Sequence, residues 1–439
     1  MNGKDVVRSQ TFFNPWLTCE HPEVEAVVAR AVEEWEREAA RSRIRKRRDK
    51  DREAFRSLAR TLVANAAHAL ALGLEPPTVA IRLAKPAAAR SRYDGPGFGQ
   101  MSSVLAAISP NLVTVRQSRR KGIASMLEPG DGLKDCIAGL DDFGNAAFRQ
   151  TSGEVIVVRH IERNYAMGTR EGVAIDYKDN EETIRLRSEV NRINAGLESA
   201  QLGFDDPSGA PVDIRKRRLR RIFNTPNDRP RFDLGGRLAD GWWENLERTR
   251  RHAIRIEGEP VADLDFRATL PRLAYIRAGL PPPAANDDPY AGILGGADEA
   301  RWRPGLKIVV NGMLWRSTPL QRLPKGTKEL LPQGRKAASL REAILERHAP
   351  IRDQFEAGIG GSLTRLESDI LVAILLRLLD LGIAALPMHD GLMVRHGAAE
   401  RAASVMREVS KELTGYELPV KVTLLAETID ITREVTSLL

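Results

Sequence analysis

The chain has few cysteines and no long apolar run. Cys19 and Cys136 are the only cysteines among 439 residues, which excludes a disulfide scaffold or a cysteine-based zinc finger and fits a reducing compartment. No stretch approaches the roughly 18 apolar residues that a membrane span needs, and residues 1–10 show no apolar segment behind their charges. We therefore expect a soluble, cytoplasmic protein with no membrane partner.

Several catalytic signatures are also missing. The sequence contains no Gly-x-x-x-x-Gly-Lys-Ser/Thr segment, which disfavours a P-loop ATPase or helicase. Its histidines show no metal-ligand spacing, and residues 1–210 contain no carboxylate set that would indicate a proofreading nuclease.

Positive charge is present in excess and is concentrated in two segments. The chain has 67 Lys and Arg against 59 Asp and Glu, a net charge of +8, which favours polyanionic partners. Arg41–Arg60 is one basic segment, and Arg215–Arg231, with eight basic residues and one acid, is the other. Either could lie along a phosphate backbone, although the first could equally be a solvated helix face.

Length and composition predict two or three globular domains, since 42% of the residues are hydrophobic. Residues 1–75 are expected to form a basic helical region. In residues 76–165 a helix at Met101–Ile108, an extended segment at Leu112–Arg116 and a basic turn outline a small α+β, winged-helix-like DNA-binding module. Residues 166–235 contain a strongly helical segment, Asn180–Ala200, and then the basic linker.

Residues 236–439 alternate strands and helices. Strands are predicted at Val261–Phe266, Ile383–Met388 and Gly391–Arg395, the last two meeting at His389-Asp390. Helices separate the first strand from this hairpin, and a further helix and strand follow it. The order predicts an α+β fold, with an antiparallel sheet backed by helices.

Two carboxylates occupy apolar surroundings in these strands. Asp265 lies at the end of one predicted strand, and Asp390 lies at the tip of the hairpin. Carboxylates on neighbouring strands can bind a pair of divalent cations, about 3.5–4 Å apart, that activate an attacking oxygen and stabilise a leaving one. Taken alone, Asp390 reads as an ordinary turn residue.

A stripe of residues spaced four apart accompanies the acids. If one helix carries Arg303, Lys307, Asn311 and Trp315, they span roughly 18 Å, which suits a nucleoside triphosphate with its phosphates near the cations and its base near the indole. Pro304 predicts that this helix begins at Arg303. The alternative is a solvated face with a packed tryptophan.

These segments resemble the palm and fingers of family A nucleic acid polymerases, the DNA polymerase I family and its single-subunit RNA polymerase relatives. Asp263–Arg272 is similar to the first palm motif, Arg303–Trp315 to the fingers helix, and Met388–Gly391 to the hairpin that carries the second metal-binding aspartate. Gly236-Arg237 is similar to a pair that contacts the primer-template. The motifs occur in the family's order.

The resemblance implies a divergent small DNA polymerase without proofreading. It implies a palm at 236–439, compact helical fingers inserted at about 288–360, and a thumb-like region at 166–235. It implies that Asp265 and Asp390 bind two Mg²⁺ ions, with Mn²⁺ as a substitute, and that the partners are a DNA primer-template and nucleoside triphosphates. It places nucleotide contacts at Arg303, Lys307, Asn311, Trp315 and Leu270. Nucleic-acid contacts are expected at Arg237, Arg272 and His389, and in the basic segment at Arg217, Arg218 and Arg221.

Three residues depart from the family pattern. Leu270 replaces a glutamate of DNA-synthesising members, so a primase or RNA polymerase stays an alternative. Trp315 replaces a smaller aromatic residue, and Gly391 replaces the acid after the second aspartate. Gly391 and the compact fingers leave open a non-catalytic DNA-binding replication initiator or regulator. The sequence indicates no particular protein partner.

Overall fold

The computed structural model describes residues 10–425 apart from 43–47, 82, 84–91, 94–97, 119–123, 142, 145–146, 151–152, 165–168, 207–211 and 297–298. The chain forms two compact units. Unit 1 comprises residues 1–154 and 208–213, and unit 2 comprises residues 155–207 and 214–439. Every helix in the described ranges is too short or too polar to cross a lipid bilayer.

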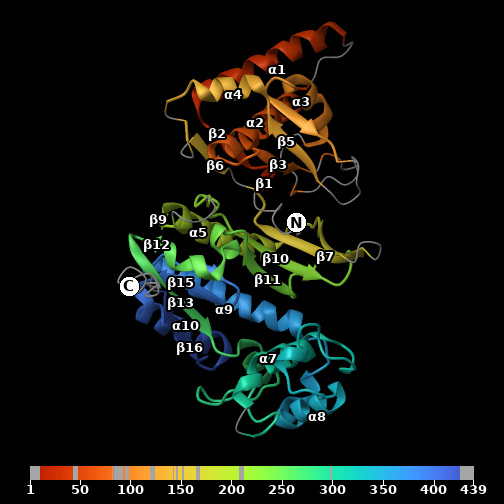
Figure 1. Ribbon diagram of the computed structural model, residues 1–439, viewed down its shortest axis with the longest axis vertical. Helices are drawn as coiled ribbons and strands as arrows, with labels where there is room; N and C mark the ends of the chain where they lie inside the picture. Colours follow the sequence, from red (N-terminus) through yellow and green to blue (C-terminus); the bar gives the residue numbers. More distant parts are fainter. Residues whose placement is uncertain are drawn as a thin grey trace, which may run out of the picture. The chain divides into compact units, whose positions relative to one another are not determined.

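Unit 1 is built around the helix α2 (Asp49–Ala71), which is buried along most of its second half and packs against α1 (Pro22–Ser42) and α3 (Met101–Ile108) (Figure 1). A four-stranded sheet has the order β1-β3-β5-β4, with β1 and β3 parallel and the other pairs antiparallel. The strands and the further helix of unit 1 are β1 (Gln10–Phe12), β2 (Leu17–Cys19), β3 (Thr78–Ile81), β4 (Val113–Arg116), β5 (Ser125–Pro129), α4 (Asp131–Ala138) and β6 (Phe148–Gln150).

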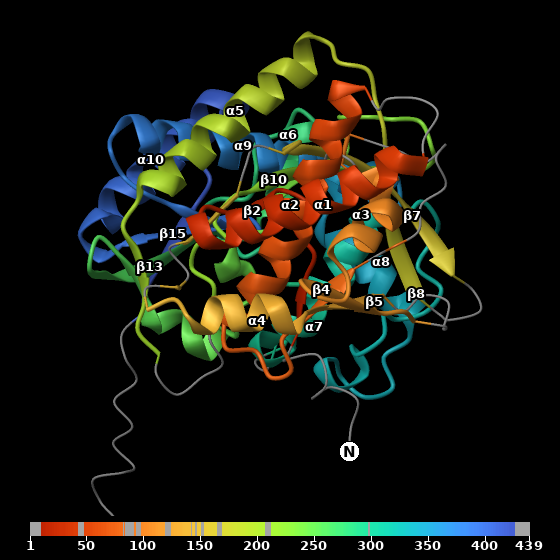
Figure 2. The same cartoon turned by 90° about the horizontal axis from the view of Figure 1, so that it is seen from above.

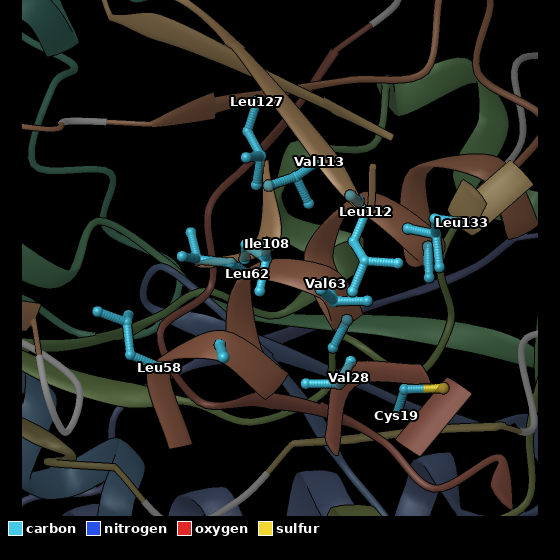
Figure 3. Packing of buried hydrophobic residues seen from close by; sticks show 14 of the residues in the cluster. Cys19, Val28, Leu58, Leu62, Val63, Ile108, Leu112, Val113, Leu127 and Leu133 are labelled. Atoms are coloured by element: carbon cyan, nitrogen blue, oxygen red, sulfur yellow. The ribbon is translucent and has the colours of Figure 1, made fainter. Parts of the chain in front are cut away.

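One hydrophobic core joins the two N-terminal regions that the sequence analysis separates. Leu62 of α2 and Val28 of α1 pack in the same cluster as Ile108, Val113 and Leu127 (Figure 3). The expected division at residue 75 therefore runs through a single core, because α2 buries its apolar side chains against strands that follow it. The strands β1 and β3 also extend the expected winged-helix outline to a mixed sheet. The basic turn at 119–121 lies outside the described residues.

Unit 2 contains a six-stranded antiparallel sheet with β13 (Glu259–Phe266) at its centre. The order is β14-β15-β13-β12-β9, and β16 also pairs with β13. Burial alternates along the end of β13, so Leu264 and Phe266 face the core while Asp263 and Asp265 share the opposite face. The other strands are β9 (Leu202–Phe204), β12 (Ile254–Ile256), β14 (Leu386–Met388), β15 (Gly391–Arg395) and β16 (Val420–Leu424).

The long helix α9 (Gly360–Asp380) is the element of unit 2 against which several other helices pack. It packs against α5 (Glu181–Ser199), α6 (Thr269–Arg277) and α10 (Ala399–Thr414) (Figures 1 and 2). Ten of its side chains are buried, because apolar residues recur on several of its faces. The helices α7 (Glu299–Trp315) and α8 (Ala337–Arg347), drawn in cyan, lie together at one end of the unit (Figure 1).

A second sheet combines strands from the expected winged-helix-like, thumb-like and palm regions. Its order is β11-β10-β7-β8, formed by β7 (Ile156–Asn164), β8 (Thr169–Ile175), β10 (Arg220–Thr225) and β11 (Gly235–Ala239). Among the described residues of 166–235, only α5 fulfils the helical expectation. Part of the basic segment instead forms the strand β10. Buried and less buried residues alternate along Arg220–Thr225, as they do on a strand that has one face in a core. The predicted α+β class, with an antiparallel sheet backed by helices, is confirmed.

Candidate active site

The structure brings Asp265 and Asp390 together. In the antiparallel ladder between β13 and β15, Asp265 is paired with Gly391, the residue that directly follows Asp390. Met388 pairs with Gly391 in the adjoining ladder, so His389 and Asp390 form the two-residue tip of the hairpin. Asp390 therefore lies next to Gly391, the residue paired with Asp265, at one end of the central strand.

These acids lie in a partly buried, negatively charged environment. Burial, followed by the negative charges of Asp263 and Asp390, raises the pKa of Asp265 to about 6 against the opposing effect of Lys307 and Lys421. Burial also raises the pKa of Asp263. The effect of Lys307 indicates that this side chain of α7 lies within electrostatic reach of Asp265.

This environment fits a hard divalent cation, since carboxylate oxygens are its preferred ligands and its charge would relieve the repulsion. The described part of the chain contains no group of three or more His, Cys, Asp or Glu side chains placed to hold a metal. The two aspartates would therefore need further ligands from water or from a bound substrate.

The four residues of the predicted stripe lie on the outer side of α7. The opposite side of the helix is buried and carries Leu306, Val310 and Met313. The helix begins at Glu299 rather than at Arg303, so the expectation drawn from Pro304 is wrong by about one turn. Pro304 is exposed within the helix, and Arg303 does not lie at its positive end.

Arg303 is held by an internal carboxylate. Its Nε donates to Asp288 Oδ2 at 2.5 Å and its Nη2 donates to Asp288 Oδ1 at 3.2 Å, while its guanidinium lies 5.1 Å from the ring centroid of Tyr290. The hydroxyl of the buried Tyr290 donates to Asn311 Oδ1 at 3.2 Å. Asp288 and Tyr290 were not identified from the sequence, because both lie in an irregular segment before the helix.

Trp315 is exposed at the end of the stripe and rests on backbone. Its side chain is 51% exposed, and a Cβ added to Gly360 would lie 2.3 Å from its Cδ2. Gly360 therefore allows the indole to lie against the start of α9. Leu270 is the second residue of α6 and is partly exposed.

Arg237 on β11 is paired with a buried acid that the sequence analysis missed. Its Nε and Nη2 donate to Glu367 Oε1 at 2.8 and 2.7 Å. Glu367 is only 3% exposed, and burial raises its pKa to about 7, against the opposing effect of Arg237 and with a further contribution from Asp390. Glu367 stands at the same helical spacing as the buried Leu363 and Ile370, so the periodicity of α9 could have placed it on the buried face.

Arg272 does not reach a surface where nucleic acid could bind. It is 2% exposed, and its guanidinium donates to the carbonyl oxygens of Arg267, Pro283, Ala284 and Asp287. These bonds fix the loop that leads from α6 toward α7. The expected primer or template contact is therefore replaced by a structural role.

The three arginines of the basic segment that were expected to contact nucleic acid donate hydrogen bonds to other groups of the protein. Arg221 is fully buried, and its Nη2 donates to Asp369 Oδ1 at 2.6 Å and to Ser368 Oγ at 3.1 Å. Arg217 donates to the carbonyls of Leu197 and Ala200 at the end of α5. Arg218 donates to Asn191 Oδ1 at 3.3 Å. Its burial keeps Arg221 from contacting nucleic acid, whereas the contacts expected at the partly exposed Arg217 and Arg218 stay predictions.

The hairpin tip is exposed and conformationally strained. His389 is exposed and adopts a φ of 56°, in the left-handed region that non-glycine residues rarely occupy. Beneath it, the buried Trp243 donates its Nε1 hydrogen to the carbonyl oxygen of Pro387 at 2.7 Å. This bond holds β14, and with it the tip, in place.

Gly391 is required by the packing of the acid pair. A Cβ at this position would lie 2.1 Å from Asp265 Oδ1 and 2.4 Å from the carbonyl oxygen of Leu264. Any side chain would displace either the carboxylate or the backbone of β13. The missing acid at this position therefore has a steric cause.

Comparison with known proteins identifies no family. No protein-family model matches the chain, and no curated protein matches it. Among solved structures, the chain is similar to the POL domain of Pol1 from M. smegmatis in complex with a DNA primer-template and dNTP, with a TM-score of 0.32 and 13% sequence identity. The match covers 92% of this chain and 66%, just under two thirds, of that one. At this TM-score the likeness assigns no activity, and the site itself must carry any functional proposal.

Replacing Gly391 by alanine is expected to destabilise unit 2 by about 1–3 kcal/mol, because the new Cβ overlaps both a carboxylate and a backbone carbonyl. Urea unfolding followed by tryptophan fluorescence measures the effect. Gly203→Ala is the matched control, since its Cβ would meet only Arg255 Cβ at 3.4 Å. Equal midpoints for Gly391→Ala and the wild-type chain would contradict the packing described for Asp265.

The raised pKa of Glu367 predicts a pH-dependent effect of Glu367→Gln. Ionisation of Glu367 destabilises the folded state progressively as the pH rises from its ordinary pKa of 4.5 to about 7, and the effect is complete above that. The melting temperature of the variant relative to wild type should therefore be higher at pH 8 than at pH 5, by about 2 °C or more. Differential scanning fluorimetry across this range checks it, and a difference that does not change with pH would contradict it.

Proposed function

We propose that the chain is a template-dependent nucleotidyltransferase, a DNA polymerase of the family A type without proofreading. The observation that carries the proposal is that Asp265, at the end of β13, lies beside the hairpin tip that carries Asp390, within electrostatic reach of Lys307 of α7. Two neighbouring acids opposite a cationic helix suit the transfer of a nucleotidyl group from a triphosphate.

Asp265 and Asp390 are the residues that would hold Mg²⁺ or Mn²⁺. Their oxygens are hard donors, and the raised pKa of Asp265 reflects negative charge that a cation would neutralise. When bound, such a pair of ions activates the attacking oxygen and stabilises the leaving one. In the reaction the primer 3′ hydroxyl loses its proton to solvent, its oxygen bonds to the α-phosphorus, the bond from that phosphorus to the bridging oxygen breaks, and pyrophosphate leaves.

The outer side of α7 binds the incoming nucleotide in this proposal. Lys307 and Arg303 hold the triphosphate, and Arg303 must first exchange Asp288 for phosphate oxygens. The exposed Trp315 stacks at the nascent base pair, with Asn311 and Leu270 at its border.

The primer-template contacts come from fewer residues than the sequence predicts. Arg237 is 40% exposed and His389 is exposed at the hairpin tip, so both can touch nucleic acid. Arg272 and Arg221 are excluded by their burial. The positive surface for the nucleic acid therefore has to include other basic residues.

Primer extension by the purified chain tests the proposal. With a labelled primer-template, Mg²⁺ and deoxynucleoside triphosphates, the wild-type chain is expected to extend the primer. Asp265→Ala and Asp390→Ala should each lower the rate by at least about a hundredfold. Asp353→Ala, which removes an exposed acid outside the site, is the matched control and should extend normally.

Two outcomes of this assay decide between the functions considered. Extension that persists in both aspartate variants, or its absence from the wild-type chain, would contradict a polymerase built on these acids. A parallel reaction with ribonucleoside triphosphates identifies the product class, and we expect deoxynucleotides to be preferred because Leu270 supplies bulk beside the acid pair.

A further inference from the structure

A buried hydroxyl joins the two acid-bearing segments. Thr269 is the first residue of α6 and is 4% exposed. Its Oγ1 donates to Asp390 Oδ2 at 3.0 Å, and its nearest other acceptor, the carbonyl oxygen of Phe266, is at 3.4 Å. A hydroxyl has one hydrogen to donate, so the shorter bond to the charged acceptor is the stronger one.

The backbone between β13 and α6 is bent to bring this hydroxyl to the hairpin. Ala268 adopts the left-handed conformation, with φ 51° and ψ 50°, directly before Thr269. Such a conformation is unfavourable for a residue with a Cβ and persists only where its surroundings enforce it. His389, on the other side of the bond, is also left-handed. Thus the bond connects two strained turns, the one that follows β13 and the hairpin tip that carries Asp390.

We propose that Thr269 is a positioning residue that holds the Asp390 carboxylate beside Asp265. The two acids are like-charged neighbours at the end of β13, so they repel each other. Without a donor to Oδ2, the exposed tip would be free to turn Asp390 away from its like-charged neighbour. With Oδ2 fixed, Oδ1 keeps a defined direction. The catalytic consequence rests on the function proposed above, whereas the anchoring of the hairpin does not.

Two variants of Thr269 separate its hydroxyl from its packing. Thr269→Val keeps the shape and removes the donor, whereas Thr269→Ser keeps the donor and removes a methyl group. Thr364→Val is the matched control: Thr364 is also 4% exposed, and its hydroxyl has no hydrogen-bond partner within the described ranges. Each variant is measured by hydrogen–deuterium exchange at residues 386–395 and by steady-state primer extension.

Thr269→Val is expected to speed exchange at the hairpin tip and to lower kcat about tenfold, with the KM for nucleotide unchanged within about twofold. Thr269→Ser and Thr364→Val should stay close to wild type in both measurements. A merely structural role would instead lower stability without this separation of kcat from KM.

Three results would overturn the inference: unchanged exchange in Thr269→Val, a wild-type kcat in that variant, or equal impairment of the serine and valine variants. If the wild-type chain extends no primer, the proposed function fails by itself. The exchange comparison then still decides whether Thr269 anchors the hairpin.

Discussion

The repulsion between two neighbouring carboxylates is the constraint on which the site depends. Asp265 and Asp390 are brought to adjacent positions by the β13–β15 ladder, and burial together with like charge raises the pKa of Asp265 to about 6. Proteins keep such an arrangement only where something compensates it. Here the compensation within the chain is partial: Lys307 and Lys421 oppose the shift, and Thr269 donates to one oxygen of Asp390. The remaining negative charge is what a divalent cation would neutralise.

Much of the surrounding architecture serves to hold these acids in place. Gly391 leaves room for the carboxylate of Asp265, and Trp243 bonds to the strand that precedes the tip. Arg272 gathers the carbonyls of the loop between α6 and α7, which ties the cationic helix to the acid-bearing strand. None of these residues needs to touch a substrate in order to matter to the reaction.

The sequence predicted those features that depend on local patterns. The strand at Asp265, the hairpin at Asp390 and the exposed stripe on α7 follow from short periodicities, and the structure has all three. It could not predict the fate of the arginines, because their partners are distant in sequence: Asp369 for Arg221 and a loop of carbonyls for Arg272. A basic segment in a sequence is therefore no guide to a basic surface when buried acceptors from elsewhere neutralise it. Arg237 and Glu367 are likewise far apart in the sequence, and Asp288 lies in an irregular segment that no pattern marks.

The most direct measurement of the central claim is the position of manganese in crystals of the chain grown with a primer-template, a non-hydrolysable deoxynucleoside triphosphate and Mn²⁺. The account predicts anomalous scattering peaks between the carboxylates of Asp265 and Asp390, with the triphosphate beside Lys307. Manganese bound elsewhere while these two carboxylates stay without metal, or a triphosphate that lies away from α7, would contradict it.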